Sequence, residues 1–237
     1  MSSKAALTIA ALGVVCLGAA PPASASHVHM ATCGVSADRT VVADSAARVY
    51  RAAAGHGQLG PVYNYYACAI GGANSHLLAR SASAVAGARL FPCGDRGCEV
   101  VRAIRLAGAT VGVIVEHHGL DSVTSTLTVR EAASGQALHA VQTYAVVGAG
   151  TLIGGELLVR YVLAPSGNIA WATVCEGEDA CRPRQPQPTR EGIIHRAIAH
   201  VVSTLDAGPA VLASSLRLHG GEIEWIDGGV ERTAPLP

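Results

Sequence analysis

The chain is short of lysine, of aromatic residues and of charge, and each shortage argues against a class of function. Lys4 is the only lysine among 17 basic residues, which balance 17 acidic ones, so no basic field is available to hold a nucleic acid. Aromatic residues are only 4% of the sequence, which argues against a platform on which sugars or bases stack. Charged residues make up 14% against 50% hydrophobic ones, and this balance predicts a folded chain with an aliphatic core.

The sequence also lacks the short motifs that carry much enzyme chemistry. It contains no G-x-S-x-G, H-E-x-x-H or P-loop motif and no G-x-G-x-x-G before a helix. The glycines of GAGTLIGG, residues 148–155, come without a lysine and lie between expected strands, so they predict a turn. We therefore predict no catalytic residue, no cofactor and no metal, and we favour a protein without enzymatic activity over an enzyme.

The first 25 residues have the pattern of a signal peptide. Lys4 supplies the positive start, residues 5–20 form an uncharged apolar run, and Ala23-Ser24-Ala25 fits the A-x-A cleavage rule. The apolar run is short for a membrane-spanning helix, and no later run is long enough for one. We predict cleavage after Ala25, a secreted or extracytoplasmic location and no membrane span after cleavage.

The cysteines predict a disulfide framework. Loss of Cys16 with the signal peptide leaves an even number of cysteines, which in an exported chain favours three disulfides: the six residues are Cys33, Cys68, Cys93, Cys98, Cys175 and Cys181. The segments CGDRGC and CEGEDAC each close a short loop within themselves, which leaves Cys33 to pair with Cys68. A zinc site is the alternative, but only CGDRGC approaches the usual spacing of zinc ligands.

Hydrophobic residues alternate with period two along most of the chain, which predicts strands. The segments GELLVRYVLAPSGNIAWATV (155–174) and SSLRLHGGEIEWIDGGVERTA (214–234) show the pattern with Gly, Pro, Asn and Asp at the turns. Residues 189–205 could form a helix, but their Ile, Val and Thr content favours a strand. We predict an N-terminal extension over 26–39 and a single all-β domain over 40–237.

Strand pairs recur at intervals of roughly 35–45 residues, the range in which propeller blades repeat. Residues 125–138 (STLTVREAASGQAL) and 162–171 (VLAPSGNIAW) resemble strands and the inner hairpin of a β-propeller blade, as in exported proteins of unassigned function. The resemblance implies a small or incomplete propeller-like array of antiparallel hairpins and brings no catalytic residues with it. A two-sheet β-sandwich explains the same alternation and remains the alternative.

His117 and His118 are the best internal candidates for metal binding or acid–base chemistry, because Glu116 precedes them and Asp121 follows. However, adjacent residues of an extended chain point to opposite faces, so we favour a solvated turn over a shared site. His195 and His200 fit neither one face of a strand nor the spacing of helical neighbours, and we expect surface or packing roles for both.

His27 and His29 follow the predicted cleavage site. If cleavage fell instead after Ser24, the terminal amine, backbone amides and His27 could hold Cu(II) in a square plane. If it fell after Ser26, the terminal amine and the rings of His27 and His29 could chelate copper together. Because chain ends are usually mobile, we favour an end without a metal.

These observations favour a secreted, disulfide-stabilised all-β binding or structural module for an unknown extracellular or envelope ligand. The alternatives are an extracellular hydrolase with a site assembled from loop carboxylates and histidines, and copper binding at the processed amino terminus.

Overall fold

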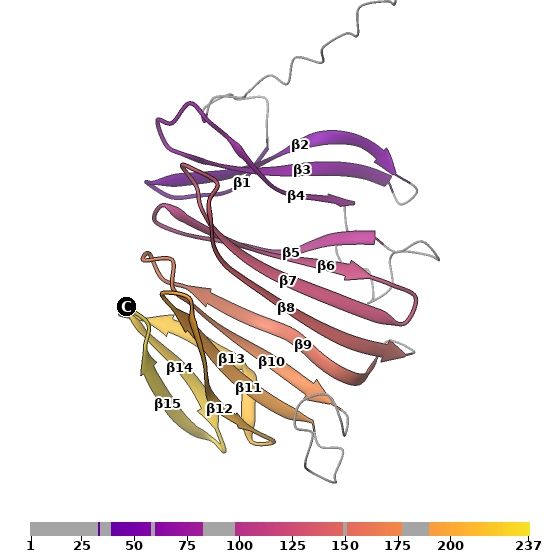
Figure 1. Ribbon diagram of the computed structural model, residues 1–237, viewed down its shortest axis with the longest axis vertical. Coiled ribbons are helices and arrows are strands. Elements are labelled where there is room, and N and C mark those ends of the chain that lie inside the picture. Colours follow the sequence, from indigo (N-terminus) through magenta and orange to yellow (C-terminus); the bar gives the residue numbers. More distant parts are fainter. Residues whose placement is uncertain (1–32, 34–38, 58–59, 83–97, 149–150, 177–189) are drawn as a thin grey trace, which may run out of the picture.

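The computed structural model describes residues 33, 39–57, 60–82, 98–148, 151–176 and 190–237, and every regular element among them is a β-strand (Figure 1). The strands are β1 (Arg39–Ala43), β2 (Ala47–Gly57), β3 (Gly60–Ala69), β4 (His76–Ala82), β5 (Cys98–Ala107), β6 (Thr110–His118), β7 (Ser122–Glu131), β8 (Ala137–Gly148), β9 (Thr151–Leu163), β10 (Ile169–Glu176), β11 (Glu191–Ile198), β12 (Val201–Gly208), β13 (Val211–His219), β14 (Glu222–Asp227) and β15 (Val230–Pro235). The all-β prediction is confirmed.

The strands form three antiparallel sheets in which each strand pairs with its neighbours in the sequence. Sheet A is β1-β2-β3-β4, sheet B runs from β5 to β12, and sheet C is β13-β14-β15. Residues 189–205 lie partly in two paired strands, β11 and β12, so the preference for strand over helix is confirmed there, although a turn divides the segment. Because consecutive strands pair within each sheet, short hairpin turns make many of the connections.

The sequence produces these strands by alternation. In β7, Val123, Leu127 and Val129 are buried while the threonines between them are less so, as expected for a strand with one face on a core. The turn between β13 and β14 consists of Gly220 and Gly221, both with positive φ, which a two-residue turn of this hand requires.

Sheet B is apolar on both faces along β9 and β10. Val162 and Ala170 face a core shared with sheet C, which includes Leu216 and Trp225. The residues next to them in sequence, such as Tyr161, belong to a second core on the opposite face. The C-terminal part of the molecule is therefore a two-layer packing of sheet C on sheet B.

Strand β9 parts from β8 after its first five residues, Thr151–Gly155, and bends away from it. Strand β8 pairs with it only up to Gly155, and beyond that point β9 turns toward β5 and β6. There the Tyr161 hydroxyl donates a hydrogen bond of 2.6 Å to the carbonyl oxygen of Gly112 in β6. A Cβ on Gly112 would lie 2.7 Å from Cε2 of the tyrosine ring, so the glycine makes room for this crossing.

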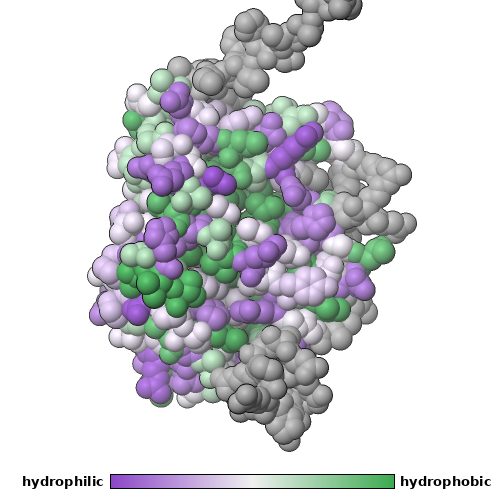
Figure 2. Space-filling view, in the orientation of Figure 1, coloured by the Kyte–Doolittle hydropathy of each residue, from purple (hydrophilic) through white to green (hydrophobic). Residues whose placement is uncertain are grey.

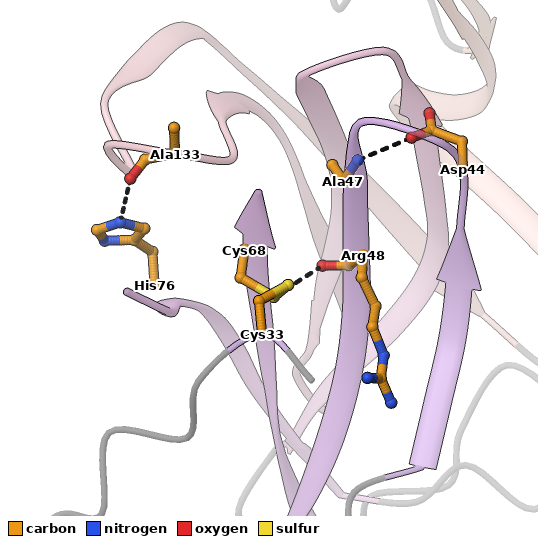
Figure 3. The surroundings of a disulfide bond; sticks show 7 residues. All are labelled: Cys33, Asp44, Ala47, Arg48, Cys68, His76 and Ala133. Carbon is orange, nitrogen blue, oxygen red and sulfur yellow. Dashed lines mark hydrogen bonds between the residues drawn. A yellow bond between two sulfur atoms is a disulfide. The ribbon is translucent and has the colours of Figure 1, made fainter. Parts of the chain in front are cut away.

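Sheet A is joined to sheet B by side chains. Ser81 of β4 accepts from the Val101 amide and donates to the Glu99 carbonyl of β5, so its hydroxyl bridges the two strands. A ring nitrogen of His76 lies 2.8 Å from the carbonyl oxygen of Ala133, in the turn after β7 (Figure 3). These contacts accompany a small core between the sheets.

The predicted disulfide Cys33–Cys68 is confirmed and ties residue 33 to β3, beside Arg48 of β2 (Figure 3). It is the only disulfide with both cysteines among the described residues, so the expectation of three is shown only in part. Cys98 and Cys175 are also disulfide-bonded. Their expected partners, Cys93 and Cys181, lie outside the described residues, and those two pairings remain predictions.

The resemblance to a propeller blade stays a prediction, but the strand order of sheet B differs from that of a blade. A blade is a four-stranded sheet, whereas sheet B continues through eight consecutive strands, and none of the described sheets closes on itself. The expected array of antiparallel hairpins is present, but here consecutive hairpins extend one sheet because each new strand hydrogen-bonds to the last.

Candidate functional site

A cleft of about 450 Å³ lies where β9 approaches β5, with β1 and β13 at its sides. Its wall is aliphatic, and its polar lining consists of three arginines: the lining residues are Val42, Ile104, Arg105, Leu106, Arg160, Val162, Leu163, Arg217 and Leu218. This volume falls within the usual range for small-molecule sites. No carboxylate is among the lining residues, so the cleft combines an apolar wall with positive charge.

The bend in β9 creates the cleft. Beyond Gly155 the edge of β9 that faced β8 no longer pairs with it, and the strand brings Arg160 and Leu163 close to Arg105 and Leu106 of β5. Sheet C then contributes Arg217 from β13. The site therefore depends on the Tyr161–Gly112 contact that fixes the crossing.

The three arginines differ in how their charges are balanced. Arg217 pairs with Glu224 and, at 3.0 Å, with Glu231, and the hydrogen bond from Arg217 is the main cause that lowers the pKa of Glu224. Arg105 lies over the Tyr161 ring, with its guanidinium carbon 5.6 Å from the ring centroid.

Arg160 donates a hydrogen bond of 3.0 Å to the carbonyl oxygen of Ser214. Across the described part of the chain, neither Arg105 nor Arg160 forms an ion pair with a carboxylate. Both guanidiniums therefore keep donors that an anion in the cleft could use, and guanidinium pairs well with carboxylate and phosphate groups.

The face of the molecule drawn in Figure 2 mixes polar and apolar side chains. Figure 2 shows hydrophobic side chains in several small patches separated by hydrophilic ones on the face drawn there. Such interspersed patches are ordinary for a folded protein and do not mark a large docking surface. The cleft is therefore a better candidate for a binding site than this face as a whole.

A second polar cluster lies around His195 of β11. Its Nε2 is 3.3 Å from Oε1 of Glu156, its Nδ1 is 3.2 Å from the Thr204 hydroxyl, and its ring stacks on Trp171. Thr173 donates a 2.6 Å hydrogen bond to the same carboxylate oxygen. The hydrogen bond from His195 is the largest cause that lowers the pKa of Glu156. Thr204, His195 and Glu156 therefore form a hydrogen-bonded series from hydroxyl through imidazole to carboxylate.

The structure separates the histidines that the sequence singled out. His118 is buried and its Nε2 lies 2.9 Å from Oε2 of Glu116, which also contacts Arg102 at 3.0 Å. His117 is exposed on the other face of β6, as adjacent strand residues should be. Asp121 is exposed as well, and no group of three metal-ligating side chains forms here among the described residues. The predicted solvated turn is therefore wrong for His118, whose buried ring lies within strand β6 beside the Glu116 carboxylate.

His27 and His29 lie outside the described residues, and copper binding there remains a prediction. Sequence reasoning missed the cleft arginines and the role of Glu156. The available signal for the arginines was their place next to aliphatic strand residues, in AIRLA (103–107) and LVRYVL (158–163), but alternation alone gives no contact between distant strands.

The fold and the cleft together define an open, antiparallel all-β protein with an apolar-walled, cationic cleft. Searches against protein-family models, curated proteins and solved structures find no match to this chain. No helix that could cross a membrane occurs in the described ranges.

Proposed function

We propose that the protein is a secreted binding module whose cleft takes a small amphipathic carboxylate. The observation that carries this proposal is that Arg105 and Arg160, which form no ion pair with a carboxylate of the described residues, lie beside an aliphatic wall. A carboxylate would accept hydrogen bonds from the guanidiniums, and a hydrocarbon tail would replace water against the wall.

Decanoate is a suitable probe because it joins one carboxylate to one unbranched tail. Isothermal titration with decanoate below its micelle concentration should show one site, and decanol should bind roughly ten- to a hundredfold more weakly because it cannot pair with a guanidinium. Equal binding of decanol would attribute the affinity to the wall alone and would overturn the anion part of the proposal.

Arginine variants locate the site. Arg105→Gln and Arg160→Gln should each weaken decanoate binding by roughly tenfold or more, since each removes a charge-assisted hydrogen bond. Arg232→Gln is the matched control, because Arg232 is an exposed arginine near Asp227 in sheet C and does not line the cleft. If all three variants bind alike, the ligand does not use the cleft.

Export is part of the proposal and has its own test. It is supported by the signal-like pattern of residues 1–25 and by the Cys33–Cys68 disulfide, which is typical of oxidising compartments. Expression of the full chain in a secreting host, followed by amino-terminal sequencing of the extracellular fraction, should give a chain that begins near Ser26. Recovery only inside the cell with Met1 intact would contradict export.

The Thr204–His195–Glu156 chain favours a hydrolase as the second candidate. In that reaction the Thr204 oxygen would attack an ester carbonyl while its proton passes to His195, and the same proton would leave with the alcohol. Water would then release the acid and restore the threonine. Hydrolysis of p-nitrophenyl butyrate should be lost in Thr204→Val. It should be kept in Thr233→Val, because Thr233 is exposed and is not part of the Thr204–His195–Glu156 series. Absence of hydrolysis in the unaltered protein refutes this candidate.

A further inference from the structure

Two histidines from separate elements meet on the far side of sheet B from sheet C. His139 comes from β8, and His200 comes from the two-residue turn between β11 and β12. Their ring centroids are 5.5 Å apart and the ring planes are inclined by 48°. Strands β9 and β10 lie between β8 and β11 in the sheet order, so the contact joins elements that are not neighbours.

The spacing of the rings suits a shared metal ion. With zinc–nitrogen bonds of about 2 Å and tetrahedral angles, two imidazole ligands place their ring centroids about 5 Å apart. We propose that His139 and His200 form a two-histidine site for a divalent transition-metal ion, with Zn²⁺ as the test ion. Since no group of three His, Cys, Asp or Glu side chains suited to a metal occurs among the described residues, water or an external ligand completes the coordination.

One ring of the pair is partly buried and the other is exposed. Partial burial, and after it the nearby charge of His200, lowers the pKa of His139. His200 is exposed, so an ion can reach the pair from solvent.

The backbone at His200 allows a decisive variant. Ala199 and His200 both have positive φ, 44° and 70°. Asn and Gly adopt this left-handed conformation at a lower energetic cost than His. His200→Asn should therefore fold at least as well as the unaltered protein while it removes one proposed ligand. A lost zinc response in this variant cannot be ascribed to misfolding.

The experiment measures thermal unfolding and zinc titration of the mature protein. Zn²⁺ should raise the Tm of the unaltered protein, because it binds only the folded arrangement, and His139→Gln and His200→Asn should each lose this rise. The matched control is the double variant His27→Ala/His29→Ala, which should keep the rise and thereby separates this site from the amino terminus. His117→Ala, which removes an exposed histidine outside the pair, should also keep it. Retention of the full zinc response in His200→Asn, or no response in the unaltered protein, overturns the proposal.

Discussion

The contact between Gly112 and Tyr161 should determine whether β9 can cross toward β5, and Gly112→Ala tests it directly. The added methyl group would lie 2.7 Å from Cε2 and 3.1 Å from the hydroxyl oxygen of the tyrosine, closer than carbon atoms pack. The ring must shift, which strains or breaks its 2.6 Å hydrogen bond to the Gly112 carbonyl. Tyr161 is only 1% exposed, so it has little room to move.

The magnitude follows from three terms. Overpacking a well-packed core costs about 1–3 kcal/mol. Loss of the hydrogen bond costs about 0.5–1.5 kcal/mol. Replacement of Gly by Ala within a strand recovers about 0.5–1 kcal/mol of backbone entropy. Gly112→Ala should therefore lower the free energy of unfolding by about 0.5–4 kcal/mol, with a central value of about 2 kcal/mol.

Urea unfolding followed by far-UV circular dichroism measures this difference, provided that the m-value is unchanged. Gly208→Ala is the control, because a Cβ there meets nothing within 4 Å, and it should be neutral or slightly stabilising. Tyr161→Phe should cost about 0.5–1.5 kcal/mol alone and less in the Gly112→Ala background, since the hydrogen bond is already disturbed there. A Gly112→Ala protein as stable as the original, or strictly additive variants, would refute the reasoning.

Three further outcomes are expected. Burial raises the pKa of the Tyr161 hydroxyl. The stability that depends on its protonated form is therefore complete below the ordinary tyrosine pKa and is lost as the pH rises above it. Tyr161→Phe should lose less stability at alkaline pH than the unaltered protein, whereas Tyr144→Phe, at an exposed site, should lose as much as the unaltered protein. Trp225→Phe removes a 2.7 Å hydrogen bond from Nε1 to the Asp206 carboxylate and should cost about 1.5–3 kcal/mol in urea unfolding. Leu216→Ala opens a cavity in the core between sheets B and C and should cost about 2–5 kcal/mol; a cost below about 1 kcal/mol would show that this core repacks.

Local pattern was sufficient to predict much of the fold. Alternation and turn residues gave the hairpin of β9 and β10 and the hairpins of sheet C, because side-chain direction in a strand and left-handed glycines are local properties. The Cys33–Cys68 pair was reached by excluding the short loops. Pattern could not give the sheet boundaries, since a strand that extends one sheet and a strand that begins another have the same alternation.

The local sequence pattern could not predict the candidate site for a further physical reason, which Arg102 and Arg105 illustrate. Strict alternation would place these two residues on opposite faces of β5. However, the register of β5 against β6 shifts between Val101 and Ala103, so one extra residue is accommodated there. Arg102 consequently reaches Glu116, while Arg105 lies over Tyr161.

Glu116 and Gly112 lie on one face of β6, so both arginines reach the same face of the sheet. A bulge moves every later residue of its strand to the opposite face of the sheet. A period-two pattern of small and branched residues does not indicate where such a bulge occurs. The charge of the cleft therefore depends on a shift of one residue in β5 as much as on the bend in β9. Insertion of a residue next to Arg102 should move Arg105 away from Tyr161 and abolish the proposed binding of decanoate, whereas the same insertion in the turn at Gly108 should leave both intact.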